Sequence, residues 1–229
     1  MDTLEKEIKY FLSDPLLFIS LFFALIVLIR YWKVLNKQSK QVGGIVLLYA
    51  IMFLVTSQLS LFAVYSSWIY NVMYIPISYC IWKLFSQEVG FENLKRQILL
   101  IFSIITFLHV CNLIFFQGIV YIATATMMLF QLFNAVLAFL YLKFRLENYD
   151  EPVHLNIINW FAFAVIIDNI VSIPTTALWS KEMYELIGHE QFALLNNIQS
   201  FLYACWYLII AFGILWNTTS LSSRFSSSS

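Results

Sequence analysis

The stretch QVGGIVLLYAIMFLVTSQLSLFAVYSSWIYNVMYIPISYCIW, residues 41–82, contains no charged residue and decides how this chain folds. As one straight helix, its 42 residues would reach about 63 Å, twice the roughly 30 Å of a bilayer's hydrocarbon core. The most polar place to turn is Tyr65-Ser66-Ser67. The run therefore predicts two membrane-spanning helices, 45–64 and 68–85, and Pro76 should kink the second.

A second charge-free run, 97–142, is again too long for one crossing and breaks at Gln117-Gly118. It predicts two further spans, 98–116 and 119–141. Three apolar segments outside the two runs complete the set, and Asp14-Pro15 is a favourable helix start for the first of them. These three predicted spans are 16–32, 157–178 and 193–216.

Composition supports the same fold class. The chain is 61% hydrophobic and 11% charged, whereas soluble domains are about 25% charged. We therefore predict an all-α polytopic membrane protein, a bundle of seven transmembrane helices whose partner is the lipid bilayer. No basic patch indicates nucleic acid. The three cysteines are scattered through apolar runs, and no metal, cofactor or catalytic motif is evident, so we assign none.

The distribution of basic residues predicts the orientation. With the N-terminus outside, ten Lys and Arg lie on the cytoplasmic side and three outside, as the positive-inside rule requires. The C-terminus is then cytoplasmic. We divide the chain into a non-cytoplasmic N-terminal segment, a seven-helix transmembrane domain and a disordered Ser-rich cytoplasmic tail, which are residues 1–13, 14–218 and 219–229. The expected location is the cell membrane, the inner membrane of a bacterium.

One acid lies in the middle of a predicted span. Asp168 falls within WFAFAVIIDNIVSIPTT, residues 160–176. A charge at the bilayer centre costs about 2.5 to 3.5 kcal/mol, so an ionisable residue there is a functional-site hypothesis by default. No span core offers a Lys or Arg as its partner, which leaves His109 as the nearby titratable candidate. Without a partner or water, desolvation favours the neutral acid.

Other polar residues of the predicted spans fall mostly in the outer half. They predict a pocket open to the non-cytoplasmic side, lined by amides, phenols and an acid. The alternative is that these groups only hydrogen-bond neighbouring helices, at about 0.6 kcal/mol each. The candidate ligand-binding residues are Asp168, Ser172, Asn196, Gln199, Tyr203, Asn71, Tyr74, Gln58, His109 and Asn112.

Two segments carry a resemblance to a known group of proteins. IYNVMYIPISYCIWKLF at 69–85 and NNIQSFLYACWYLIIAFGIL at 196–215 place Asn, Tyr and Pro in apolar helices. In these segments the chain resembles uncharacterised small seven-helix membrane proteins of Bacteroidota-type bacteria. The resemblance implies a seven-helix fold and a polar site in the outer half. That group has no established activity to carry over.

Several functions fit this pattern. The leading hypothesis is a sensor-like protein that binds a small molecule from the non-cytoplasmic side and signals through a separate cytoplasmic or membrane partner. Pro76 and Pro174 are its candidate hinges. The alternatives are a small-molecule or proton-coupled transporter, a structural subunit of a membrane complex, and an intramembrane enzyme using Asp168 and His109 as acid and base. Against transport, spans one to three and five to seven show no convincing sequence similarity.

Overall fold

The computed structural model describes residues 15–61, 67–87, 94–116, 123–148, 156–178 and 189–226, without some side chains near helix ends. Within these ranges the chain forms seven α-helices and no strand. The helices are α2 (Pro15–Tyr31), α3 (Lys37–Leu61), α4 (Ser67–Phe85), α5 (Lys95–Phe115), α6 (Thr124–Asn148), α7 (Ile157–Leu178) and α9 (His189–Ser226).

Five of the helices are long and apolar enough to cross a membrane, which indicates a multi-pass membrane protein. They are α3, α5, α6, α7 and α9. The other two helices are not among these five. The apolar helix α2 is shorter, with 17 residues, and α4 carries several polar residues, including Asn71 and Lys83, along its 19. Each charge-free run is divided between two helices, as predicted. Of the predicted turns at 65–67 and 117–118, Ser67 is the first residue of α4 and the other residues lie outside the described ones.

Asparagine side chains explain where two helices begin. The Ser39 amide donates a hydrogen bond of 2.7 Å to Oδ1 of Asn36, which caps α3 before its first residue. The helix therefore starts at Lys37 and not at 45, and its first turns are polar. In the same way, the Ile158 amide donates to Oδ1 of Asn156 at 2.9 Å, and α7 begins at Ile157 as predicted.

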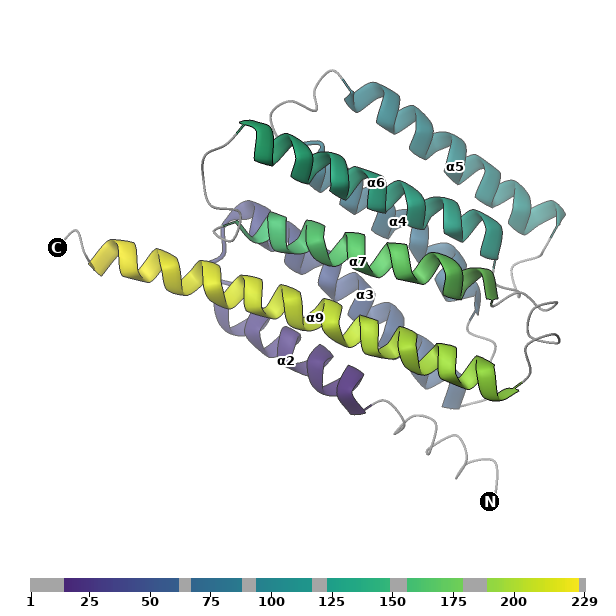
Figure 1. The fold of residues 1–229 in the computed structure, drawn as a ribbon, viewed down its shortest axis with the longest axis horizontal. Helices are drawn as coiled ribbons and strands as arrows, with labels where there is room; N and C mark the ends of the chain where they lie inside the picture. The colour runs from purple at the N-terminus through teal and green to yellow at the C-terminus, as the bar shows by residue number, and fades with distance from the viewer. Residues whose placement is uncertain are drawn as a thin grey trace.

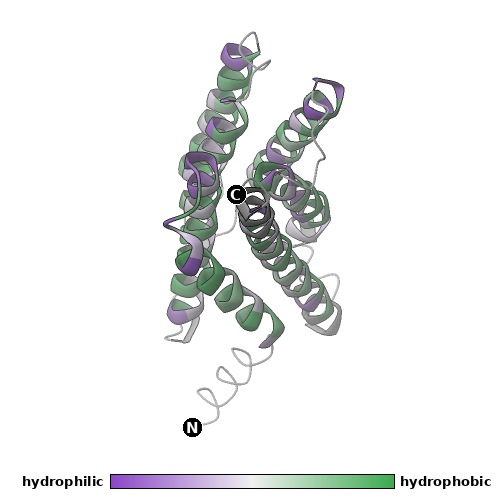
Figure 2. Cartoon of the chain, turned by 90° about the vertical axis from the view of Figure 1, so that its left-hand side faces the viewer, coloured by the Kyte–Doolittle hydropathy of each residue, from purple (hydrophilic) through white to green (hydrophobic). Residues whose placement is uncertain are grey.

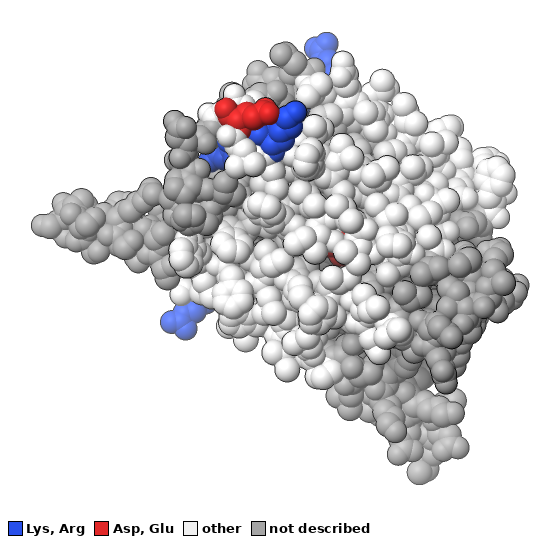
Figure 3. Space-filling model, viewed as in Figure 1, with Lys and Arg blue, Asp and Glu red and all other residues white. Residues whose placement is uncertain are grey.

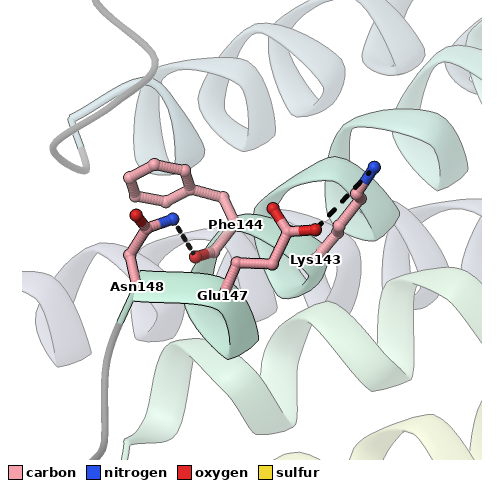
Figure 4. Close-up of polar contacts among 4 residues, drawn as sticks. All are labelled: Lys143, Phe144, Glu147 and Asn148. Atoms are coloured by element: carbon pink, nitrogen blue, oxygen red, sulfur yellow. Dashed lines mark hydrogen bonds and ion pairs between the residues drawn. The ribbon is translucent and has the colours of Figure 1, made fainter.

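Two helices continue beyond their predicted ends because hydrogen-bonding polar residues follow the apolar segment. At the end of α6, Lys143 and Glu147 lie 3.9 Å apart, and the Asn148 amide donates to the carbonyl of Phe144 at 2.8 Å (Figure 4). The helix α9 continues to Ser226 and so includes most of the segment 219–229 that the sequence predicts to be disordered.

The helices form two layers (Figure 1). One layer contains α5, α6, α7 and α9 in that order, and the other contains α4, α3 and α2 behind them. Across the layers α2 packs against α9, α3 against α7, and α4 against α6. Successive helices run in opposite directions (Figure 1), so α2 and α9 are parallel. The start of α2 and the end of α9 therefore lie at the two different ends of the bundle.

The helix contacts repeat between two three-helix units. If α2, α3 and α4 are exchanged with α6, α7 and α9 in that order, the pairing of the helices repeats, although α6 and α7 pack extensively and α2 and α3 touch only slightly. The α2–α3 contact becomes α6–α7, α3–α4 becomes α7–α9, and α2–α9 becomes α6–α4, while α3–α7 maps onto itself. The contact of α5 with α6 alone has no counterpart among these. The bundle is thus an approximate two-fold arrangement with α5 outside it.

Glycine sets the separation of α7 and α9. A Cβ atom added to Gly213 of α9 would lie 2.8 Å from both Cβ and Cγ of Trp160 on α7. A side chain at this position would therefore push the two helices apart. Figure 2 shows hydrophobic residues along most of the helices, although the interior also buries polar side chains such as Asn71, His109 and Asp168.

All basic side chains that the structure describes lie at one end of the bundle. They lie at or beside the last turns of α2, α4 and α6 or the first turns of α3 and α5, and the alternating directions bring these five ends together. On the face shown in Figure 3 the blue side chains lie at that end, and the wide central surface is uncharged. The basic residues are Arg30, Lys33, Lys37, Lys40, Lys83, Lys95, Arg96, Lys143 and Arg145.

Candidate functional site

Asp168 lies in the middle of α7 and is 6% exposed. The Ser172 hydroxyl, one turn further along, donates to Oδ1 of Asp168 at 3.4 Å, a long hydrogen bond. Within the described residues Asp168 has no other hydrogen bond and no ion pair. Only Glu147 and Asp168 are acidic among the described side chains. Figure 3 shows one acidic group beside basic atoms at the edge and a second, recessed one near the centre.

Phenol groups from three helices lie in the same part of the bundle as this acid. Tyr49 of α3, Tyr74 of α4, and Tyr203 and Tyr207 of α9 all lie within electrostatic range of the Asp168 carboxyl group. The Tyr74 and Tyr203 hydroxyls are also close enough to interact with each other. Because α3 faces α7 across the layers and α4 and α9 flank this pair, the fold brings these residues to the two-fold centre.

Two glutamines extend the site from the phenols. The Gln131 amide of α6 donates to the Tyr74 hydroxyl at 3.3 Å and to the Thr176 hydroxyl at 2.8 Å. The Gln199 amide donates to the Tyr203 hydroxyl at 3.1 Å. Both glutamine Oε1 atoms are buried and have no hydrogen-bond partner in the described part of the chain. We call the acid, its phenols, Ser172 and these glutamines the Asp168 cluster.

A second buried polar group joins α4, α5 and α6. His109 Nε2 lies 2.8 Å from the carbonyl oxygen of Asn71, which can only accept, and Nδ1 lies 2.7 Å from the Thr126 hydroxyl. The Asn112 amide donates to the same hydroxyl at 3.3 Å, and Oδ1 of Asn71 accepts from the Ala123 amide at 3.0 Å. In this His109 cluster both ring nitrogens have partners.

The structure thus divides the residues predicted from sequence into two sets. Asp168, Ser172, Tyr74, Tyr203 and Gln199 belong to the Asp168 cluster. Asn71, His109 and Asn112 belong to the His109 cluster, so His109 is not the hydrogen-bond partner of Asp168. The acid–base pair required for an intramembrane enzyme is therefore not formed.

Two predicted site residues lie in neither set. Gln58 is exposed, because it follows the buried Thr56 by two residues and therefore points to another side of α3. Thr56 bonds within its own layer, with its hydroxyl 3.3 Å from that of Tyr70. The side chain of Asn196 lies outside the described part of α9.

Three residues of the Asp168 cluster are missing from the predicted binding residues: Gln131, Tyr49 and Tyr207. Gln131 was detectable as an isolated amide in a charge-free span. Its spacing from Asn134, whose amide donates to the Ser78 hydroxyl at 3.0 Å, also indicates a polar stripe on one face of α6. Tyr49 gave no such signal, because an aromatic residue in an apolar helix usually serves packing.

A separate groove lies between α7 and α9, away from Asp168. It has a volume of about 380 Å³ and is lined by Trp160 and four residues of α9, Ile209, Phe212, Leu215 and Trp216. Its lining is apolar and its position is on the outside of the bundle, with Phe212 54% and Trp216 53% exposed. A lipid-facing surface of this composition is expected in any membrane protein.

Comparison with known proteins gives no assignment: no family model, no curated protein and no solved structure matches this chain. The resemblance to small seven-helix bacterial membrane proteins stays a prediction. Within the described residues no three His, Cys, Asp or Glu side chains gather into a metal site. The Asp168 cluster is therefore judged on its own chemistry.

Proposed function

We propose that the chain crosses the bacterial cell membrane seven times and binds a small molecule in the Asp168 cluster, acting as a sensor-like protein. The basic end of the bundle supports a cytoplasmic position for that end, which leaves the N-terminus outside. A helix of 17 residues such as α2 reaches about 26 Å, near the thickness to be crossed. Signalling would require a separate partner protein.

One observation carries the binding proposal: a buried carboxyl group, which has one long hydrogen bond among the described residues, lies within electrostatic range of phenols from three helices. Burying a polar group without full hydrogen bonding is costly, and the cost in a membrane interior is not recovered from water. A bound molecule that completes these hydrogen bonds recovers part of it. A purely structural cluster gains nothing from leaving this capacity unused.

The test uses the full-length protein purified in detergent and a library of small polar molecules. A ligand should raise the thermal midpoint of the unaltered protein, and the rise should be lost in Asp168→Asn and reduced in Tyr203→Phe. If every rise in the midpoint persists unchanged in both variants, the Asp168 cluster is not the binding site.

The contact repeat favours a second candidate, a transporter. Many transporters are built from two parallel repeats related by an axis along the membrane normal, with the substrate site between them. The units α2–α3–α4 and α6–α7–α9 are arranged in this way, and the Asp168 cluster lies between them. Proteoliposomes loaded with a pH-sensitive dye separate the two functions, because a sensor moves neither protons nor ligand.

A further inference from the structure

The Asp168 carboxyl group has no positive partner within the described structure. All nine described Lys and Arg residues lie at one end of the bundle, whereas Asp168 lies in the middle of α7. His109 is bonded to Asn71 and Thr126. An isolated buried carboxylate is costly, and a positive charge brought close to it with good hydrogen-bond geometry offsets part of that cost.

Hydrogen-bond acceptors in the cluster have capacity left over, beside the phenol O–H groups and the buried N–H of Trp206, which can donate. Each glutamine amide donates to a phenol, which leaves Oε1 of Gln131 and Oε1 of Gln199 buried without a partner among the described residues. Asp168 adds acceptor capacity, since only Ser172 donates to it there. A molecule that completes the hydrogen bonds of these acceptors must supply N–H or O–H donors.

Aromatic rings cover the same region. The ring of Trp206 lies 4.9 Å from that of Tyr49 and 5.0 Å from that of Tyr207, centroid to centroid, and both tyrosine hydroxyls lie within electrostatic range of Asp168. Ring faces attract cations, by about 0.5 to 2 kcal/mol depending on desolvation. An anion would be repelled by the carboxylate, the amide oxygens and the ring faces, and could be bound only through the phenol O–H groups and the N–H of Trp206.

From these three features we infer that the Asp168 cluster binds a protonated organic amine. The ammonium group pairs with the Asp168 carboxylate and donates to the free amide oxygens, and the apolar part of the ligand packs on the rings of Tyr49, Trp206 and Tyr207. This inference rests on the proposed function, because it names the ligand class of the same site.

The experiment compares three probes of similar size and shape but different charge: benzylamine, which is protonated at neutral pH, benzyl alcohol and benzoate. Each is titrated into the full-length protein in detergent while the thermal midpoint is followed. Benzylamine should stabilise the protein, benzyl alcohol should stabilise it less, and benzoate should not. This comparison uses the unaltered protein and needs no variant to fold.

Variants then locate the effect. Asp168→Asn should weaken benzylamine binding by about thirtyfold or more, as expected when one partner of a buried charge pair is removed. Asp168→Glu keeps the charge and should retain part of the binding. Glu147→Gln is the matched control, because it neutralises an exposed acid at the end of α6 and should leave the affinity unchanged.

Several results overturn the inference. Equal stabilisation by benzyl alcohol, a preference for benzoate, or no response to benzylamine would each exclude an amine site. The proposed function fails separately, when no library compound gives a rise in the midpoint that depends on Asp168. A neutral ligand whose effect depends on Asp168 would overturn the amine inference and leave the binding proposal in place.

Discussion

The two buried polar clusters of this bundle differ in how completely their hydrogen bonds are made. In the His109 cluster, both ring nitrogens are bonded across α4, α5 and α6. In the Asp168 cluster, the acid receives one long bond, and two glutamine oxygens have no partner in the described part of the chain. Both clusters are deeply buried, with His109 0% and Asp168 6% exposed.

This difference separates structural polar groups from candidate functional ones. A polar group whose bonds are complete repays its burial by holding helices together. A buried polar group that lacks hydrogen-bond partners lowers stability. A protein retains such a group where another molecule supplies the missing hydrogen bonds. The contrast predicts that substitutions in the His109 cluster change stability, whereas substitutions in the Asp168 cluster change binding.

The largest loss of stability is expected for His109→Leu. It removes two interhelical hydrogen bonds, and membrane-protein bonds contribute up to about 1.7 kcal/mol each, so the free energy of unfolding should fall by about 2 to 3 kcal/mol. Denaturant titration in mixed micelles measures this. Phe107→Leu, on the exposed side of the same helix, is the control, and a similar loss there would contradict the assignment.

A smaller loss is expected for Gly213→Ala, which affects the Asp168 cluster without changing a polar atom. The added methyl group would lie 2.8 Å from Trp160, so α7 and α9 must separate slightly, at a cost of about 1 to 2 kcal/mol. Ligand binding should weaken too. Gly44→Ala, whose added Cβ meets nothing within 4 Å, should leave stability and binding unchanged.

Gln131→Leu should cost less than about 1 kcal/mol, although it removes as many hydrogen bonds as His109→Leu. The reason is that the substitution also removes a buried oxygen without a partner, whose desolvation costs about 1 to 3 kcal/mol. The same denaturant titration compares the two variants directly. Equal losses of stability in Gln131→Leu and His109→Leu would show that the buried oxygen without a partner does not lower stability.

The smallest change is expected for Asp168→Asn, within about 0.5 kcal/mol of the unaltered protein or slightly more stable. The amide has nearly the same shape as the acid and avoids the cost of a charge in the membrane interior. Its thermal midpoint without ligand should therefore match that of the control Glu147→Gln. A loss as large as that of His109→Leu would mean that Asp168 holds the fold together.

Much of the fold is predictable from sequence because it follows from the bilayer's thickness. The charge-free runs had to divide, and α7 occupies the predicted residues 157–178. The start of α3 was not predictable from hydropathy, because it depends on the cap formed by Asn36. The contact repeat was hidden as well, since helix packing needs only apolar surfaces of similar shape and leaves little trace in sequence similarity.

The candidate site was predictable only in part. Asp168 was identified because an acid in a span has few explanations. How the other candidate residues divide between the two clusters depends on which side of each helix faces inward. Most of the helices are so apolar that their sequences do not show which side that is. His109 and Asp168 therefore fell into one predicted pocket, although they are bonded to different neighbours.

The helix outside the two units has a consequence for how such a protein is synthesised. If all seven helices cross the membrane, as proposed, a three-helix unit begins and ends on opposite sides of it. The second unit can then enter with the same orientation only after one more crossing, which α5 would provide. Of the five candidate spans, α5 is the most apolar and the least buried by the protein. Its insertion is therefore expected to depend mainly on contact with lipid and little on the neighbouring helices. Substitution of one apolar residue by another is expected to be tolerated on its outer surface.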